Sequence, residues 1–310
     1  MTWRVLITAP YMLPRLEHFR QRLEAEGIEI VTLPVRERLD EAELLAVVPS
    51  LDGVICGDDQ FTERVLLSAG RLKVISKWGT GIDSIDCRAA ERLGIRVYNI
   101  RGAFTDPVAD TVMGYVLSFA RRIPWMDRDV RDGLWMKADG VALRKRTLGI
   151  VGVGDIGRAV ARRAHAFGMR LRGNDPVIPP TSFLAETGMM MVDLDTLLAE
   201  ADFISLNCDL NPTSFHLIGR EELALVRQPA FLVNTARGPI VDEKALVVAL
   251  QEGRLAGAAL DVFEIEPLPA DSPLRRLDRC LLAPHNSNSD PSAHERVHEA
   301  TIANLLSGLR

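Results

Sequence analysis

Four residues of the kinds that handle protons and carboxylates follow three short apolar runs, namely Arg237, Asp261, Glu266 and His285. An arginine can hold a carboxylate with two parallel hydrogen bonds. An imidazole can give or take a proton near neutral pH, and a carboxylate beside it orients the ring and favours its charged form. The apolar runs are typical of buried strands, and ligands of open α/β sheets bind beyond the carboxyl ends of the strands. We therefore expect these four side chains to meet around one ligand.

Taken singly, each of these residues has a more ordinary interpretation. An arginine after a strand is often part of a surface ion pair, a single histidine is often only hydrogen-bonded, and a glutamate before a proline often lies in a solvated turn. A shared site is favoured because a nucleotide-binding pattern precedes them in the chain.

That pattern is a glycine-rich turn between a predicted strand and a predicted helix. The run from Thr147 to Val151 is apolar enough for a buried strand, and residues 158–167 have the pattern of a helix. Between them stand Gly152, Gly154 and Gly157, spaced as G-x-G-x-x-G. The first glycine allows a tight turn, the second lets the backbone approach a pyrophosphate, and the third lets helix and strand pack closely. The pyrophosphate would lie on the free N–H groups at the start of the helix.

Asp175 stands about 20 residues beyond the glycines, at the end of the next predicted strand, where such sites place an acid. A carboxylate there accepts hydrogen bonds from ribose hydroxyls and repels a 2′-phosphate, which predicts NAD rather than NADP as the cofactor. The alternative is a purely structural turn with a solvated aspartate. Together with the four ionisable residues, the pattern predicts hydride transfer coupled to proton transfer.

Predicted strands alternate with predicted helices along both halves of the chain, which indicates an α/β fold with parallel sheets. A long apolar helix from Asp106 to Arg122 separates the halves. The strands are expected at residues 3–8, 28–33, 51–56, 72–76, 95–99, 148–152, 169–174, 202–206, 230–234, 256–260 and 280–283.

The composition of the chain indicates which classes of binding partner and which cellular compartment are expected. The chain has 310 residues, is 47% hydrophobic and carries a net charge of −5, which suits two domains and argues against binding to nucleic acid or to an anionic membrane. No apolar run approaches the roughly 18 residues of a membrane span. The four cysteines lie far apart without a C-x-x-C pair, which indicates reduced thiols in a cytoplasm and no structural metal site.

Over almost its whole length the sequence resembles the D-isomer-specific 2-hydroxyacid dehydrogenase family, most of all its phosphoglycerate dehydrogenase-like branch. The resemblance rests on the glycine turn and on short motifs at residues 108–110, 133–135, 167–169, 174–176, 234–238, 261–264 and 284–285. It implies two doubly wound parallel-sheet domains: a Rossmann NAD-binding domain at residues 100–286, inserted into a flavodoxin-like substrate domain made of residues 1–99 and 287–310. It also implies a homodimer.

The resemblance further implies roles for individual residues. Arg237 would hold the substrate's carboxylate and carbonyl oxygen, and His285 would be the general acid–base at the C2 oxygen with Glu266 as its partner. Asp261 would bind the nicotinamide carboxamide. The remaining cofactor contacts would come from Asp155 and Ile156 at the pyrophosphate, from Thr235 and Ala236 at the nicotinamide, and from Cys208 beside the cofactor. The substrate carboxylate would meet backbone N–H groups of the loop Lys77, Trp78, Gly79, Thr80 and Gly81, since a glycine-rich turn forms an anion-binding nest.

Some positions depart from the usual family pattern and leave the substrate open. Asp110 replaces a commoner glutamate, Asn286 to Asn288 replace a run of small residues, and Trp78 is bulky beside the substrate loop. Lys77 could pair with a second anionic group, a phosphate or a distal carboxylate, or it could be a solvated lysine.

Three functions are compared on this basis. The favoured one is an NAD-dependent oxidoreductase that interconverts a D-2-hydroxy acid and its 2-oxo acid. The first alternative is an NAD(H)-sensing binding protein of the same fold with weak catalysis. The second is a zinc peptidase, because residues His294 to His298 match H-E-x-x-H. The expected third zinc ligand is missing from the residues that follow, so a helix with a polar face is the preferred interpretation of that motif.

Overall fold

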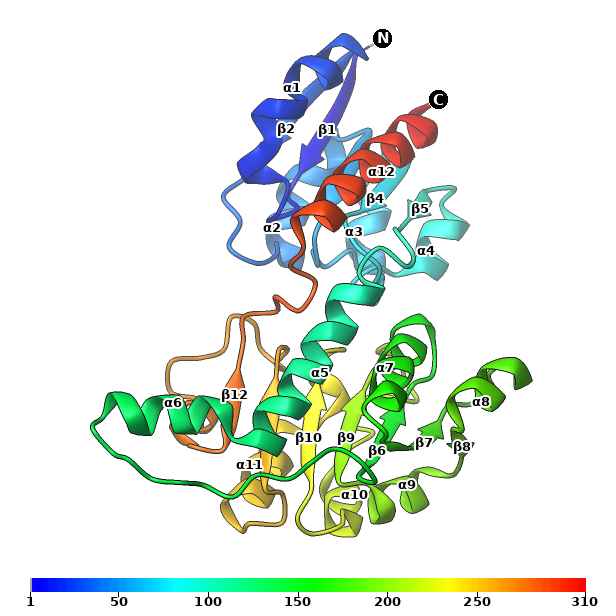
Figure 1. The fold of residues 1–310 in the computed structure, drawn as a ribbon. Helices are drawn as coiled ribbons and strands as arrows, with labels where there is room; N and C mark the ends of the chain where they lie inside the picture. Colours follow the sequence, from blue (N-terminus) through cyan, green and yellow to red (C-terminus); the bar gives the residue numbers. More distant parts are fainter. Residues whose placement is uncertain (1) are drawn as a thin grey trace. The chain divides into compact units, whose positions relative to one another are not determined.

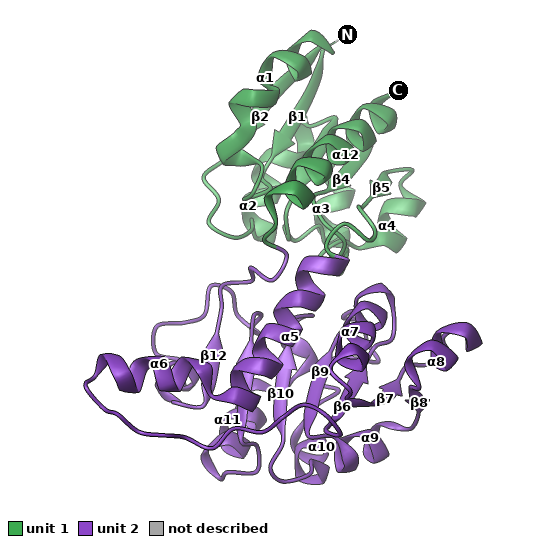
Figure 2. Cartoon of the chain, viewed as in Figure 1, with its two compact units in different colours: residues 1–104, 289–310 green, residues 105–288 purple. Residues whose placement is uncertain are grey.

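The computed structural model describes residues 2–310 and divides into two compact units (Figure 1, Figure 2). Unit 1 comprises the residues up to Phe104 together with Ser289–Arg310, and unit 2 comprises Thr105–Asn288. The sequence placed the corresponding boundaries after residues 99 and 286. The α/β class and the two parallel-sheet domains are confirmed by the strand pairing within each unit.

Unit 1 is built on a five-stranded parallel sheet with the order β2-β1-β3-β4-β5, the flavodoxin-like arrangement. Its strands are β1 (Trp3–Ile7), β2 (Ile28–Thr32), β3 (Gly53–Cys56), β4 (Val74–Lys77) and β5 (Arg96–Tyr98). Its helices are α1 (Leu16–Ala25), α2 (Glu41–Val47), α3 (Glu63–Leu67), α4 (Cys87–Arg92) and α12 (Pro291–Leu309). Thr62 caps α3, accepting a hydrogen bond from the N–H of Val65.

Helix α12 packs directly on the sheet of unit 1, although it comes from the far end of the chain. Two glycines allow the close approach. A Cβ at Gly53 would lie 2.9 Å from Leu305 of the helix, and one at Gly308 would collide with Val74 of β4. The residues after 288 therefore complete the core of unit 1.

Unit 2 holds a seven-stranded parallel sheet with the order β12-β11-β10-β9-β6-β7-β8. This is the dinucleotide-binding strand order, extended by one strand at the β11 edge. The strands are β6 (Thr147–Val151), β7 (Arg170–Asn174), β8 (Met190–Met191), β9 (Phe203–Leu206), β10 (Phe231–Asn234), β11 (Gly257–Leu260) and β12 (Cys280–Leu282). The helices are α5 (Thr105–Arg121), α6 (Ile123–Arg131), α7 (Asp155–Ala166), α8 (Thr181–Thr187), α9 (Leu194–Glu200), α10 (Arg220–Leu225) and α11 (Glu243–Gln251). The sequence did not predict β8, because two residues are too few to show a strand period.

The long helix expected from Asp106 to Arg122 is α5, and it ends where Arg122 takes a left-handed backbone with φ +56°. One face of α5 is buried, with Val108, Val112 and Val116 among its core residues, and the helix packs on α7. Its first turns are fastened by Arg163 of α7, whose guanidinium is 2.8 Å from Asp106 and 2.6 Å from Asp110.

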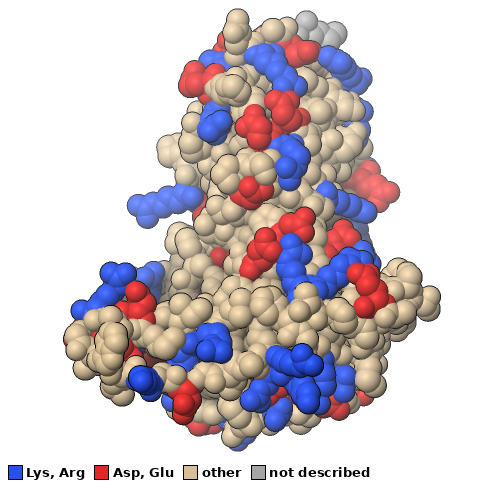
Figure 3. Space-filling view, in the orientation of Figure 1, with Lys and Arg blue, Asp and Glu red and all other residues tan. Residues whose placement is uncertain are grey.

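Charge is distributed without a dominant sign. Basic and acidic side chains are interspersed over most of the face drawn in Figure 3. Among residues 2–310, no helix combines the length and the apolar character that crossing a membrane requires.

Candidate active site

The glycine turn joins β6 to α7 at the carboxyl edge of the unit 2 sheet. Gly152 has φ +87°, and a Cβ there would collide with the backbone of Cys208, while a Cβ at Gly157 would collide with the carbonyl oxygen of Gly152. The fold itself therefore requires these two glycines.

Gly154 differs, because apart from its neighbours in the chain no atom of residues 2–310 lies within 4 Å of where its Cβ would stand. Gly154 is the N-cap of α7, and no side chain caps the helix. The residues present therefore fit a pyrophosphate: the space beside Gly154 is open, and the N–H groups of the first turn have no side-chain acceptor.

Asp175 lies immediately after β7 and touches the glycine turn. Its Oδ2 accepts a hydrogen bond from the N–H of Val153 at 2.7 Å, and its Oδ1 accepts one from Val177 at 2.7 Å. These two bonds fix the half-buried carboxylate beside the turn. Each carboxylate oxygen retains a second lone pair, so the group can still accept hydrogen bonds from two ribose hydroxyls.

The turn after β10 carries Thr235, Ala236 and Arg237, and it is shaped by a residue to which the sequence gave no role. Asn234 is buried, donates from Nδ2 to the carbonyl of Arg237 at 2.9 Å, and accepts at Oδ1 from the N–H of Ala236 at 3.0 Å. Nearby after β9, burial raises the pKa of the Cys208 thiol to about 11, so that the side chain is neutral at physiological pH.

The structure brings His285 into contact with Glu266, and their role as an acid–base pair stays a prediction. The Nδ1 of His285 lies 2.9 Å from Oε2 of Glu266, and the other carboxylate oxygen of Glu266 accepts a hydrogen bond from the N–H of Phe263 at 2.9 Å. Because Nδ1 faces Glu266, a proton exchanged with a ligand would pass through Nε2. His285 has φ +50°, a conformation that a non-glycine residue keeps only where its surroundings hold it.

Asp261 keeps the backbone of His285 in this left-handed conformation. It is fully buried, its backbone carbonyl accepts from the N–H of His285 at 2.7 Å, and its two carboxylate oxygens accept from the N–H groups of Asn286 and Ser287 at 2.8 and 2.9 Å. The sequence assigned Asp261 only to the nicotinamide and missed this anchoring role. The contact with the nicotinamide stays a prediction.

Arg237 completes the set in unit 2. Its Nη1 donates to the carbonyl of Ala236 at 2.8 Å and its side chain is half-buried. The next residue, Gly238, lies so close to the peptide between Phe263 and Glu264 that a Cβ would overlap it. The turn of Arg237 and the loop of Glu266 are thus in direct contact, and Asp261 links that loop to His285.

The expected substrate loop, Lys77–Gly81, follows β4 in unit 1. Lys77 is buried, its ammonium lies 3.2 Å from Oδ1 of Asp58, and it donates to the carbonyl of Trp78 at 3.1 Å. The expectation of a solvated lysine is therefore wrong. The bulky ring of Trp78 is also buried, stacked on Tyr11 with 4.9 Å between ring centroids and tilted against Phe104.

The two histidines of the H-E-x-x-H motif pack around Trp78. The indole Nε1 donates to Nδ1 of His298 at 2.9 Å, and the His294 ring meets the indole edge-on. Burial lowers the pKa of His298, in agreement with a neutral ring that accepts this bond. The expected polar helix face is wrong at His298, which is 3% exposed. Within residues 2–310, neither histidine belongs to a cluster of metal-ligating atoms.

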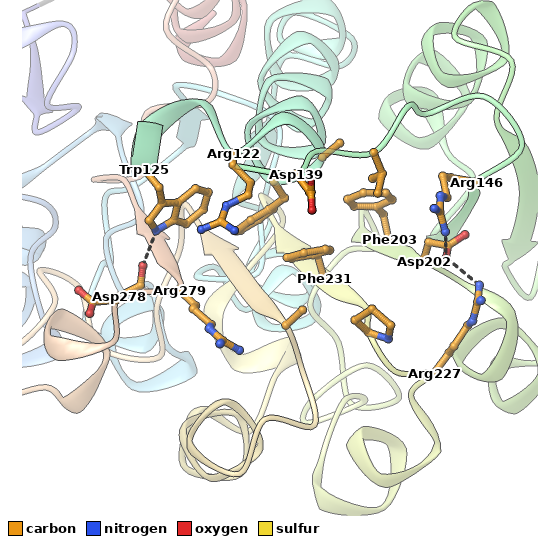
Figure 4. Close-up of a pocket in the computed structure, with 15 residues that line it drawn as sticks. Arg122, Trp125, Asp139, Arg146, Asp202, Phe203, Arg227, Phe231, Asp278 and Arg279 are labelled. Atoms are coloured by element: carbon orange, nitrogen blue, oxygen red, sulfur yellow. Dashed lines mark hydrogen bonds and ion pairs between the residues drawn. The ribbon is translucent and has the colours of Figure 1, made fainter. Parts of the chain in front are cut away.

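A separate cavity of about 520 Å³ opens at the opposite edge of the unit 2 sheet, where the strands begin. Figure 4 shows its rings and charged groups, including Trp125, Phe203, Phe231, Arg122 and Arg279. Asp202 is held there by Arg227 at 2.7 Å and Arg146 at 3.5 Å. The cavity is remote from the carboxyl edge and contains none of the predicted site residues.

Comparison with known proteins agrees with this geometry. The sequence model of one protein family, described as the NAD binding domain of D-isomer specific 2-hydroxyacid dehydrogenases, matches residues 113–287 of this chain. The chain is 42% identical over 254 residues to a glyoxylate reductase of Korarchaeum cryptofilum, covering 80% of this chain and 76% of the relative. It is 42% identical over 287 residues to a D-3-phosphoglycerate dehydrogenase of Methanocaldococcus jannaschii, covering 91% of this chain but 54% of that longer relative.

Among solved structures, D-lactate dehydrogenase from Aquifex aeolicus in complex with NAD and lactic acid superimposes with a TM-score of 0.87 at 27% identity. The match covers 97% of this chain and 93% of that one. The chain belongs to the D-isomer-specific 2-hydroxyacid dehydrogenase family and is an NAD-dependent oxidoreductase of 2-hydroxy and 2-oxo acids.

Proposed function

We propose that this enzyme reduces a small 2-oxo acid, of which glyoxylate is the simplest candidate, to the corresponding 2-hydroxy acid. The observation that carries the proposal is the 2.9 Å contact between His285 and Glu266, in the same unit as the pyrophosphate-binding turn. That contact supplies a proton donor beside a nucleotide site, which is what reduction of a carbonyl by a nicotinamide requires.

Each residue in the proposed mechanism has a distinct task. NADH, when bound, supplies the hydride that adds to C2. His285 gives the proton from Nε2 to the C2 oxygen, and Glu266 keeps a negative charge at Nδ1 that favours the imidazolium beforehand. Arg237 holds the carboxylate and the oxo oxygen, and its positive charge stabilises the negative charge that develops on that oxygen. The reverse reaction uses the same groups with His285 as the base.

The proposed cofactor contacts follow the positions described above. Gly152, Gly154 and Gly157 shape the turn, Asp155 and Ile156 donate backbone N–H groups to the pyrophosphate, and Asp175 accepts from the ribose. The nicotinamide end would be lined by Thr235 and Ala236 and bound by Asp261, with Cys208 beside the cofactor.

The proposed substrate carries no second anionic group. Lys77 would be the natural partner of a distal phosphate, but its charge is already matched by Asp58 in a buried ion pair. The contribution we propose for the loop of Lys77, Trp78, Gly79, Thr80 and Gly81 is therefore its backbone N–H groups, offered to the carboxylate that all 2-oxo acids share.

A spectrophotometric panel tests this function. Glyoxylate, pyruvate, hydroxypyruvate and 3-phosphohydroxypyruvate are offered with NADH and with NADPH, and D- and L-2-hydroxy acids are offered with NAD. We expect the highest kcat/KM with an uncharged small oxo acid and NADH. A preference for the phosphorylated acid would overturn the substrate class, and no oxidation with any acid would favour the NAD(H)-sensing alternative. His285→Ala should lower kcat by about 10²–10⁴-fold, and a kcat near wild type would refute its role.

We also propose that the chain forms a homodimer through unit 2. Helix α6 and the segment after it expose apolar side chains, with Trp135 86% and Met136 68% exposed. The cavity of Figure 4 offers rings for such side chains, and Arg122 and Arg279 in it have no ion-pair partner within the described part of the chain. A second copy matches both features, because its own α6 segment would bring apolar groups together with acidic ones.

Light scattering after size-exclusion chromatography tests the dimer. We expect a dimer for the wild type, a monomer for the W135S/M136S double variant, and an unchanged dimer for the control Val248→Ser, which alters an exposed apolar residue of α11. A wild-type monomer, or a double variant that still dimerises, would contradict the proposal.

We propose a cytoplasmic location as well. All four cysteines are unpaired thiols in the structure, a state that a reducing compartment maintains. Cell fractionation would test it, and recovery from an oxidising compartment would contradict it.

A further inference from the structure

The loop from Asp261 to Glu266 is also held through Glu264, which contacts His216 and Glu243; we call these three residues the clasp. The Oε1 of Glu264 accepts from the N–H of Glu243 at 3.1 Å and lies 2.9 Å from Nε2 of His216. In return, the N–H of Glu264 donates to Oε2 of Glu243 at 3.2 Å. The loop is thereby tied to the first turn of α11 and to the segment before α10.

The clasp is connected to the acid–base pair through a single peptide. Glu264 follows Phe263, whose N–H donates to Oε1 of Glu266, and the other oxygen of Glu266 contacts His285. Phe263 is buried, and its peptide with Glu264 presses on Gly238. A displacement of Glu264 therefore moves the donor that sets the direction of the Glu266 carboxylate.

The charges of the clasp explain why a histidine belongs there. Two half-buried carboxylates lie close together, and burial together with the charge of Glu264 raises the pKa of Glu243. A nitrogen donor on Glu264 offsets that repulsion. His216 is presented by a left-handed backbone with φ +50°, its N–H donates to the carbonyl of Pro239 at 2.8 Å, and its ring stacks on Phe215. The backbone thus directs this ring at Glu264 at a conformational cost.

We propose that His216 is a positioning residue for the reaction: its hydrogen bond to Glu264 fixes the loop that aims Glu266 at His285. This inference rests on the proposed roles of Glu266 and His285. If it is correct, any effect of His216 on kcat depends on the presence of Glu266.

Kinetics of variants at residue 216 test the claim. His216→Phe keeps a ring but removes the donor, and His216→Asn tolerates the left-handed backbone but is too short to reach Glu264. Each should lower kcat about tenfold, the equivalent of one hydrogen bond to a charged group, while KM for NADH stays unchanged. His216→Gln, which can place an amide N–H where Nε2 stands, should recover most of the rate. His165→Ala, an exposed histidine of α7, is the matched control and should have no effect.

The decisive measurement is the double variant with Glu266→Gln. If His216 acts through Glu266, adding His216→Phe to Glu266→Gln causes no further loss of kcat. Hydrogen exchange provides a readout without turnover: the amides of Phe263 and Glu264 should exchange faster in His216→Phe than in wild type or His165→Ala.

The outcomes separate the two levels of the proposal. A Glu266→Gln variant with wild-type kcat would overturn the proposed role of Glu266 and the inference with it. An impaired Glu266→Gln together with wild-type rates for His216→Phe and His216→Asn would overturn the inference alone. So would losses that multiply in the double variant, or unchanged exchange of the loop amides.

Discussion

Replacing Glu266 by glutamine should lower kcat for 2-oxo acid reduction by about 10- to 150-fold. The structure shows one hydrogen bond between Glu266 and the His285 ring, at 2.9 Å. A hydrogen bond to a charged group contributes about 1.5–3 kcal/mol, and each 1.36 kcal/mol of barrier is a factor of ten in rate. This magnitude takes the cost as the loss of the charged acceptor at Nδ1 of His285.

The second oxygen of Glu266 determines how the glutamine side chain must lie. Oε1 accepts from the N–H of Phe263 at 2.9 Å, so the glutamine must keep its carbonyl oxygen there and turn its NH₂ group toward His285. Nδ1 then has to accept rather than donate, which holds the ring in its neutral form. The proton for the substrate must come from a neutral imidazole, a far weaker acid than the imidazolium.

Initial rates followed by NADH absorbance, at saturating oxo acid and cofactor, measure the effect. The control is Glu186→Gln, which removes an exposed carboxylate of the same unit that pairs with Arg162. Binding of NADH should be unchanged in both variants. A Glu266→Gln variant that keeps more than about a third of the wild-type kcat, a barrier change below about 0.65 kcal/mol, would refute the reasoning. A loss confined to NADH binding would refute it as well.

Three further predictions concern the glycine turn, the cofactor and pH. Gly157→Ala should lower the Tm and weaken NADH binding, because its Cβ would collide with Gly152. Gly154→Ala should weaken NADH binding at an unchanged Tm. Equal Tm values for the two variants would contradict this prediction. Asp175→Ser should reduce the preference for NADH over NADPH in kcat/KM by about tenfold or more, because a ribose acceptor and the repulsion toward a 2′-phosphate are both lost. An unchanged ratio of the two kcat/KM values would argue against Asp175 as the ribose-binding residue. The lowered pKa of His298 means that its contribution to stability is present above the unfolded-state value of about 6.5 and is lost as pH falls through the folded-state value. Thermal unfolding between pH 8 and 5 should therefore fall more steeply for the wild type than for His298→Gln, and parallel curves would show that His298 is not responsible.

The sequence was sufficient for the features that depend on local pattern. Each predicted strand exists within two residues of its expected bounds, because buried parallel strands are short continuous apolar runs between turn residues. The rule that ligands bind at the carboxyl ends of parallel strands predicts that Arg237, Glu266 and His285 share one site.

Features that depend on contacts between distant segments were not predictable. Nothing in the sequence around Lys77 reveals that Asp58 will neutralise it, and nothing around His298 reveals that an indole 220 positions away will donate to its ring. The position of His216 in the clasp depends on a left-handed backbone and on the meeting of two segments, one after β9 and one after β11. Asp261 illustrates the same limit, since its backbone partners lie 25 and 26 positions further along the chain.

The chain passes from unit 1 into unit 2 and then returns to unit 1. This connectivity determines the order in which the two units can be completed during synthesis. A nascent polypeptide that has not yet reached residue 289 can already contain all of unit 2, yet the sheet of unit 1 still lacks α12, and the face around Gly53 and Val74 has no cover. The residues of unit 1 that precede unit 2 in the chain therefore complete their core only after unit 2 has been synthesised, and their apolar surface stays uncovered until then.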